Sequence, residues 1–512
     1  MTFLVVFLAW PVGTVLARGL EGSAWEVLSR SSTRSIAWFT VWQAVVSTLL
    51  TLVAGLPIAY VLHRYRLPAR RLLLAVVTVP FVLPTVVVGT AFRTVLPQEW
   101  IGTVTAIVIA HVFFNVAVVV RVVGGLWSRL DPRYDQAARS LGASPWYAFR
   151  TVTWPLVRPA VLAASALVFC FTFTSFGVVL VLGGPTHPTL EVEIYRRTAQ
   201  LLDLPGAAAI AVVQLLAVAT VLLVSARLQD RLAVRQRSRP AGEQLGPVRG
   251  LPAHALVAVV LAEIALIAVP MAALLVRSLR VGDGWGLAWW RVLFAAPVTT
   301  RDVDIVASVR TSLGYAAATA VVAVVIGGLA ACAVAYSRRG GRALETWSMI
   351  PLGASAVTVG FGLLLAFSRP PLDLRGSVVL VPLGHALVAI PLVLAVTLPV
   401  LRALDPRLRE VATTLGASPW RTWRTVDGRA LAPALAVGAG LAAAVSLGEF
   451  GATAFLARTG EPTLPVVVVR LLGRPGEANV GTAAAAATLL MVVTAAIVLL
   501  ADRWRTERAG TL

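Results

Sequence analysis

The sequence contains no lysine and only two cysteines, and each scarcity excludes a class of site. All 44 basic residues among the 512 are arginine. A Walker A loop needs a lysine at the phosphates of its nucleotide, so this chain cannot bind ATP in that way. Cys170 and Cys332 both fall in long apolar runs, where free cysteine behaves as a small apolar residue. We therefore predict no disulfide framework, no metal site and no cofactor.

Charged residues are also scarce: 13% of the chain is charged and 58% is hydrophobic, with a mean hydropathy of +0.84. This balance lies outside the range of soluble domains. Apolar runs long enough to cross a hydrocarbon layer of about 30 Å recur from end to end. Backbone amides in lipid must be paired within their own segment, so these runs predict helices. We predict an all-α integral membrane protein with spans at 2–18, 36–62, 72–96, 101–125, 157–183, 206–228, 253–276, 307–335, 345–367, 375–401, 431–456 and 480–501.

The distribution of arginine predicts the orientation. If the N-terminus is cytoplasmic, the cytoplasmic loops hold 27 arginines and the opposite loops, with their borders, hold 16. This arrangement follows the positive-inside rule and makes both termini cytoplasmic. The formal net charge of +20 therefore needs no nucleic-acid partner, and no aromatic-basic platform or groove-reading motif accompanies it.

The chain contains an internal duplication. Leu130–Ala160 aligns without gaps on Leu404–Ala434, and sixteen of the thirty-one positions are identical, including the hexapeptide LGASPW. On this offset of 274 residues, each half holds six spans in the same order and orientation, which is a parallel repeat. We predict repeats at 1–228 and 251–512, joined by an arginine-rich cytoplasmic linker at 229–250.

The duplicated segment has the features of a helix-turn-helix loop. Gly142 and Gly416 are suited to end a short helix in the left-handed conformation. The serine and proline that follow can cap and start a second helix, on which aromatic residues three apart share one face. The expected ridge and its helix start comprise Ser144, Pro145, Trp146 and Phe149 in the first loop, and Ser418, Pro419, Trp420 and Trp423 in the second. Such a ridge either packs against helix ends of its own chain or docks into a partner, and its duplication favours a partner that is itself present twice.

These loops resemble the EAA loop of binding-protein-dependent ABC importer permeases. The first copy has the pattern in Gln136-Ala137-Ala138, Gly142 and Val152-Thr153-Trp154-Pro155; the second has Glu410-Val411-Ala412 and Gly416 but departs from it at Val426-Asp427-Gly428-Arg429. The segments at 110–121, 170–184, 190–195 and 446–458 resemble the ferric-iron and thiamine permease group. The resemblance covers nearly the whole chain.

The resemblance implies the fold and partners of a type I ABC importer permease in a bacterial inner membrane. Two copies of a separate ABC ATPase subunit would receive the two loops, and an extracytoplasmic binding protein would deliver a small solute, with ferric iron ranked ahead of thiamine. The chain itself would be no enzyme.

Polar residues inside the predicted spans are candidates for the translocation path, because they are costly in lipid. His111 and His385 occupy equivalent positions, and interhelical hydrogen bonding is favoured over a metal site, since no cysteine or carboxylate stands at ligand spacing. For Glu449 we favour a gate or packing role over direct contact with cargo, and for Glu263 a peripheral contact. The path candidates are His111, Asn115, Phe176, His385, Glu449 and Phe450.

Two other functions compete with an ATP-driven importer. A twelve-helix secondary transporter also has parallel halves, but it usually needs a relay of buried carboxylates. Apart from Glu345 at the first residue of one span, the predicted spans hold only Glu263 and Glu449. It would also have no use for two matched loops. A membrane-embedded lipid enzyme would need a catalytic constellation, and we find none in the sequence.

Overall fold

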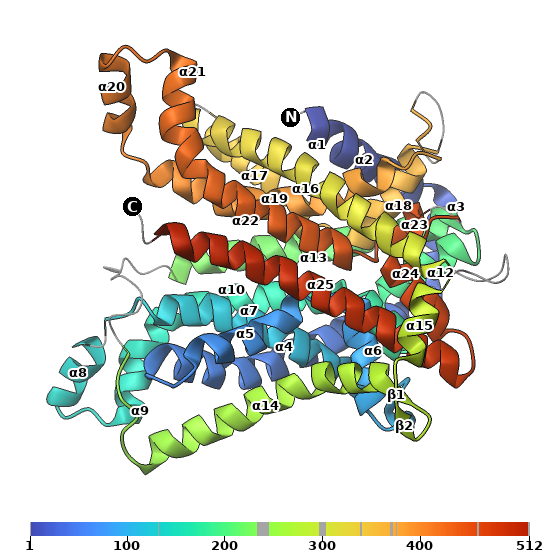
Figure 1. Ribbon diagram of the computed structural model, residues 1–512, viewed down its shortest axis with the longest axis horizontal. Coiled ribbons are helices and arrows are strands. Elements are labelled where there is room, and N and C mark those ends of the chain that lie inside the picture. The colour runs from blue at the N-terminus through green and yellow to red at the C-terminus, as the bar shows by residue number, and fades with distance from the viewer. Residues whose placement is uncertain are drawn as a thin grey trace.

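The computed structural model describes residues 2–131, 133–232, 245–295, 304–337, 340–368, 372–374, 376–457 and 460–509. It is a bundle of long helices that run side by side (Figure 1). Within the described residues, ten helices are long and apolar enough to cross a membrane, or twelve if each of two bent helix pairs is one span. The prediction of an all-α membrane protein is confirmed.

The first half of the chain forms one set of elements. They are α1 (Thr2–Leu4), η1 (Val5–Ala9), α2 (Trp10–Gly19), α3 (Gly22–Ser29), α4 (Ser31–Arg64), α5 (Arg70–Val82), α6 (Thr85–Val95), η2 (Gln98–Trp100), α7 (Val104–Trp127), α8 (Arg133–Ser140), α9 (Pro145–Ala148), η3 (Phe149–Thr153), α10 (Trp154–Phe173), α11 (Gly177–Leu182), α12 (Leu190–Ala199) and α13 (Leu204–Leu232).

The second half repeats this order and adds a short hairpin. Its elements are α14 (Leu251–Leu279), β1 (Arg280–Val281), β2 (Gly284–Trp285), α15 (Ala288–Phe294), α16 (Ile305–Tyr336), α17 (Gly341–Gly353), α18 (Ala356–Ala366), α19 (Leu380–Ala403), α20 (Pro406–Thr414), α21 (Pro419–Thr422), η4 (Trp423–Asp427), α22 (Gly428–Gly448), α23 (Thr453–Leu456), α24 (Leu464–Leu472) and α25 (Glu477–Ala509). The two strands pair antiparallel.

Two predicted spans, 72–96 and 345–367, are not continuous helices. The pair α5 and α6 bends by 108°, and the pair α17 and α18 bends by 94°. Pro84 precedes α6 and cannot donate a backbone hydrogen bond to the preceding turn. In the second half, the Ser355 side chain caps α18 by accepting from the Thr358 amide at 3.2 Å. Each break places irregular backbone in the interior of the bundle.

Two further predicted spans, 157–183 and 431–456, were also wrong as single helices. Here α10 ends at Phe173 and α22 ends at Gly448, and each is followed by a turn and a short helix, α11 or α23. At the second of these turns, the Glu449 carboxylate accepts from the Ala452 amide at 2.8 Å. This hydrogen bond satisfies one of the amides that the start of a helix leaves unpaired, and so stabilises the turn.

A glycine brings two corresponding helices close together in each half. A Cβ built on Gly55 of α4 would lie 2.7 Å from Cβ of Val119 in α7, and one on Gly327 of α16 would lie 2.9 Å from Cβ of Val393 in α19. Small residues allow such close helix crossings in membranes. The valines, Val119 and Val393, are equivalent on the offset of 274 residues, and the glycines differ from that offset by two positions, so the duplication extends to the packing of these helices.

The two halves are interlocked. Helix α2 of the first half packs on α18 of the second, and α14 of the second half packs on α6 of the first. The first long helix of each half therefore covers the broken helix of the other half. Most of the predicted linker, 233–244, lies outside the described residues. At its described end, the Gly246 amide donates to the Arg64 carbonyl at 2.9 Å.

Candidate functional site: two exposed loops and a central cavity

Two helical loops project from one end of the bundle, which we call the loop end (Figure 1). They are formed by α8 and α9 and by α20 and α21, which contain the repeated hexapeptides. Gly142 and Gly416 have φ values of +89° and +80°. The amide after each glycine donates back into the preceding helix, from Ala143 to Ala138 at 3.1 Å and from Ala417 to Ala412 at 3.0 Å. This left-handed helix end is the one predicted from the glycines.

The second helix of each loop starts as the serine and proline predict. The Ser144 hydroxyl accepts from the Tyr147 amide at 3.2 Å, and the Ser418 hydroxyl accepts from the Arg421 amide at 3.4 Å. The prolines occupy the first turn, where no amide is needed.

An aromatic ridge lies on each of these helices. The rings of Trp146 and Phe149 stack with centroids 5.7 Å apart, and those of Trp420 and Trp423 stack at 5.1 Å. Trp146 is 69% exposed and Trp420 is 68% exposed. The chain's own helix ends therefore leave both tryptophans uncovered, and the ridge is open to a partner.

The two loops are held to the bundle by different charges. Asp427 is buried and accepts from both Nε and Nη2 of Arg409, at 3.0 and 2.6 Å; the Arg409 guanidinium lies 5.2 Å from the ring centroid of Tyr336. Hydrogen bonding to Asp427 raises the pKa of Arg409 above its usual value. In the first loop, Asp135 stands at the position equivalent to Arg409 and lies 3.9 Å from the Arg64 guanidinium.

A cavity of about 480 Å³ lies between the two halves at the breaks of the bent helices. Its wall includes Phe81 and Thr85 on either side of the first break, and Gly353 to Val357 across the second. Leu167, Cys170 and Phe171 of α10 extend it toward the loop end. Five of the six predicted path residues line it: His111, Asn115, Phe176, Glu449 and Phe450. His385 is not among the lining residues.

Both histidines form the interhelical hydrogen bonds expected of them. His111 Nδ1 lies 3.3 Å from the Ser47 hydroxyl of α4, and Nε2 lies 2.8 Å from the Ser175 hydroxyl. His385 lies 2.8 Å from both Ser446 and Thr453. Among the described residues, no cluster of three His, Cys, Asp or Glu side chains could hold a metal ion.

A cluster of aromatic side chains lies on the side of this cavity away from the loop end. Phe176 and Phe450 are equivalent in the two halves, and their rings stack across the interface with centroids 5.2 Å apart and planes 11° from parallel. Tyr195 of α12 contacts Phe176 at 5.3 Å and Phe455 at 5.7 Å. We call Phe176, Phe450, Tyr195 and Phe455 the aromatic plug.

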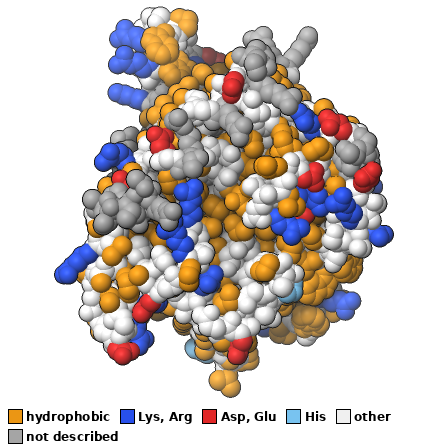
Figure 2. Space-filling view, turned by 90° about the vertical axis from the view of Figure 1, so that its right-hand side faces the viewer, with side chains coloured by type: hydrophobic (Ala, Val, Ile, Leu, Met, Phe, Trp, Pro, Cys, Tyr) orange, Lys and Arg blue, Asp and Glu red, His pale blue; other side chains and the backbone are white. Residues whose placement is uncertain are grey.

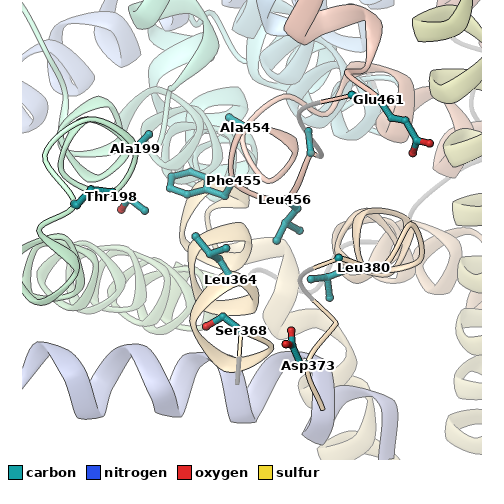
Figure 3. A pocket seen from close by; sticks show the side chains of 14 residues that line it. Thr198, Ala199, Leu364, Ser368, Asp373, Leu380, Ala454, Phe455, Leu456 and Glu461 are labelled. Atoms are coloured by element: carbon teal, nitrogen blue, oxygen red, sulfur yellow. The ribbon is translucent and has the colours of Figure 1, made fainter. Parts of the chain in front are cut away.

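Beyond the aromatic plug lies a second cavity, of about 980 Å³. Figure 3 shows Phe455 of the plug between Thr198 and Leu456 in its wall, with Asp373 and Glu461 at separate edges. This cavity belongs to the end of the bundle opposite the loops, where charged side chains of both signs are scattered among apolar ones (Figure 2). The plug thus separates two cavities that lie on the same interface between the halves.

The sequence analysis missed the polar residues of α12. Glu191 and Glu193 are completely buried, although this short helix lies outside every predicted span. Glu193 is paired with Arg197 at 2.7 Å, whereas Glu191 accepts from the Gln214 amide group of α13. A comparison of the two repeats could have revealed them. The equivalent positions in α24 are Pro465 and Val467, so the two acids occur in one half only.

Comparison with known proteins agrees with this geometry. The sequence matches the family described as binding-protein-dependent transport system inner membrane component twice, at residues 51–238 and 323–507. It is 28% identical over 472 residues to the thiamine transport system permease protein of Escherichia coli K12, covering 85% of this chain and 83% of the relative.

Other relatives extend over the whole chain or over one half. The thiamine transport system permease protein of Brucella abortus strain 2308 is 27% identical over 522 residues, covering 97% of this chain and 93% of the relative. The sulfate transport system permease protein of Escherichia coli K12 is 32% identical over 254 residues, covering 46% of this chain and 91% of the relative. A single half of this chain therefore corresponds to a whole permease elsewhere. The chain belongs to the family of inner membrane components of binding-protein-dependent transport systems, and it is a permease that carries two copies of the family's module in one polypeptide.

Proposed function

We propose that this permease imports thiamine, delivered by an extracytoplasmic binding protein and driven by two copies of a separate ATPase subunit. The observation that carries this proposal is the pair of open aromatic ridges on loops at one end of the bundle, in a chain whose full-length relatives are thiamine permeases. Each half with its loop, 1–228 and 251–512, would serve one ATPase subunit. The loop end would face the cytoplasm together with both termini.

The ridges have the properties of a docking site. Exposed tryptophans that enter a desolvated pocket dominate many interfaces, and their truncation commonly costs about 2 kcal/mol or more. The sites proposed for ATPase contact are those named from the sequence: Gln136, Ala137, Ala138, Gly142, Ser144, Pro145, Trp146 and Phe149 in one loop, and Glu410, Ala412, Gly416, Ser418, Pro419, Trp420 and Trp423 in the other. Both loops attach directly to long helices, α10 and α22, whose far ends reach the aromatic plug.

The aromatic plug supports a path with two alternating openings. In this arrangement the cavity between the bent helices extends toward the loop end, and the stacked Phe176 and Phe450 close it on the other side. A rigid movement of the two loops would carry α10 and α22 with them, so the plug would part as the loop end closes. The conformation described here would then be the inward-open one.

Thiamine now ranks ahead of ferric iron as the proposed cargo, which reverses the order expected from the sequence. Three relatives that cover between 85% and 97% of this chain are thiamine transport system permease proteins.

The cargo is tested by uptake into vesicles that contain the permease with its ATPase and loaded binding protein. We expect ATP-dependent accumulation of radiolabelled thiamine and none of ferric iron. Uptake of iron without uptake of thiamine would refute the proposed cargo while leaving the permease assignment intact.

A further inference from the structure

We propose that the cavity wall beside the aromatic plug is a transit site for an organic cation, formed by Glu449 and Asn115 in the wall with Glu191 buried behind it. This inference deepens the proposed function, on which it rests, by assigning the side chains that would recognise a positively charged cargo inside the permease.

The first observation is a set of buried hydrogen-bond acceptors that have no donor. Asn115 lines the cavity and is 1% exposed, and its Oδ1 has no hydrogen-bond partner. Its amide nitrogen donates to the His111 carbonyl at 2.9 Å, which fixes the oxygen as the unpaired atom. Gln214 Oε1 is likewise buried without a partner, and Glu191 Oε2 accepts no hydrogen bond of good geometry, although Ser355 lies close to the Glu191 carboxyl group. A buried polar atom without a partner is costly, and acceptors are satisfied by a ligand that carries N–H or O–H donors.

The second observation is a pair of carboxylates without a counter-ion. Glu449 lines the cavity, and the carboxyl group of Glu191 interacts with Ser355, which lines the same cavity, and with Glu449. The other buried acids of the described residues behave differently: Glu193 is paired with Arg197, and Asp427 with Arg409. Neither Glu191 nor Glu449 forms an ion pair within the described part of the chain. Burial and mutual repulsion disfavour the ionised form of two neighbouring acids, and a cation bound beside them would stabilise that form.

The third observation is the aromatic surface next to these acids. Phe450 follows Glu449 in the chain, and its ring stacks on Phe176 in the wall of the same cavity. When such a stack opens, its ring faces are available to a flat cation, because aromatic faces attract positive charge at about 0.5–2 kcal/mol per contact. Carboxylate, amide oxygen and ring face together suit an aromatic cation with an amino group. Thiamine has this chemistry, with a positively charged thiazolium ring and an aminopyrimidine.

One of the two acids also has a structural bond that the cargo does not need to break. The Glu449 carboxylate accepts from the Ala452 amide at 2.8 Å at the start of α23. That bond supports the packing role favoured from the sequence and holds the group in place, while the carboxylate still faces the cavity. Glu191 is held in a similar way by Gln214. A fixed site of this kind would hold its cargo without a large reorganisation of side chains.

The test is equilibrium dialysis of radiolabelled thiamine against the purified permease–ATPase complex without binding protein. Unlabelled thiamine and thiochrome, its uncharged oxidation product, serve as competitors. We expect thiamine to displace the label at least tenfold more effectively than thiochrome. Glu449→Gln and Glu191→Gln, which keep side-chain shape and hydrogen-bonding oxygen, should each weaken thiamine binding at least tenfold. Glu263→Gln is the matched control, because this carboxylate lies in α14 outside the cavity, and it should bind as the wild type does.

The outcomes separate this inference from the proposed function. Equal competition by thiochrome, no measurable binding, or wild-type affinity in both glutamine variants would overturn the transit site. If vesicles take up thiamine while any of these results is obtained, the inference alone fails. If vesicles take up no thiamine, the proposed cargo is wrong. In that case, charge-selective binding that is lost in the glutamine variants would still support a site for organic cations. Elution of each variant at the wild-type position in gel filtration shows that lost binding is not lost folding, and Glu449→Asp, which keeps the charge, should retain part of the affinity.

Discussion

Asp427 gives the second loop a buried carboxylate that the first loop lacks. It stands where the EAA pattern of the family is broken, and its equivalent in the first loop is Thr153. In the structure it is 3% exposed at the side chain and bonded to Arg409 of α20. Where the second loop departs from the family's pattern, an ion pair between Arg409 and Asp427 therefore attaches α20 to η4.

Removing that carboxylate should loosen the second loop. Asp427→Ala leaves Arg409 without its partner. Because Arg409 is 28% exposed at the side chain, we expect a cost of about 1–3 kcal/mol, below the cost for fully buried pairs. Limited proteolysis should cut the variant at 404–430 several times faster than the wild type. Thr153→Ala is the matched control in the first loop, and equal cleavage of both variants would contradict this account of Asp427.

A second prediction at this scale concerns the aromatic plug. Phe450→Ala removes one ring of the stacked pair, and with it about 3–5 kcal/mol of buried apolar packing, so the two cavities should connect. Vesicles that contain this variant should leak a small dye without ATP. Phe81→Ala, which changes the wall of the inner cavity but not the plug, serves as the control, and a tight Phe450→Ala variant would mean that the plug is not a gate.

At the scale of elements, the sequence predicted the features that depend on local chemistry. Gly142, Gly416 and the Ser-Pro pairs specify their backbone conformation directly, and both loops have the predicted helix ends and starts. The cores of the long helices follow from apolar runs in the same way.

Features that depend on contacts between distant segments could not be predicted. Pro84 and Ser355 interrupt apolar runs that look continuous, because a proline in a membrane helix can give a kink or a break depending on what surrounds it. The stacking of Phe176 on Phe450 arises only when the two halves meet. Glu191 was missed because α12 is too short and too polar to be predicted as part of a span, yet it is inserted among longer helices.

The prediction at the scale of elements concerns the two loop glycines, Gly142 and Gly416. Valine at Gly142 or Gly416 would have to adopt a positive φ, at a cost of about 1–2 kcal/mol, or else move the second helix. Uptake should fall at least severalfold for each variant at unchanged levels in the membrane. Ala143→Val is the control: it adds the same bulk next to Gly142, at a residue whose φ is not positive. This variant should transport nearly normally. If Gly142→Val and Gly416→Val both transport nearly normally too, the left-handed helix ends are not required for coupling of the loops to transport.

At the scale of the whole molecule, the fold combines twofold repetition with asymmetry in its interior. The loops and the histidines repeat at equivalent positions, as expected if each half engages the same partner subunit. Glu191, Glu449 and Asn115 have Pro465, Ser175 and Ala389 as their counterparts, so the interior is not symmetric. A solute that is itself asymmetric can be bound in only one orientation by such an interior, whereas the symmetric exterior can receive two identical subunits.

The most direct test of the central claim measures thiamine uptake in vesicles while the ATP supply and the proton gradient are varied independently. The permease should be reconstituted with its ATPase and binding protein, as wild type and as the double variant Trp146→Ala with Trp420→Ala. We predict that wild-type uptake requires ATP, persists when the gradient is collapsed, and is lost in the double variant together with ATPase binding. Uptake that persists without ATP and disappears with the gradient would contradict the account and favour a secondary transporter.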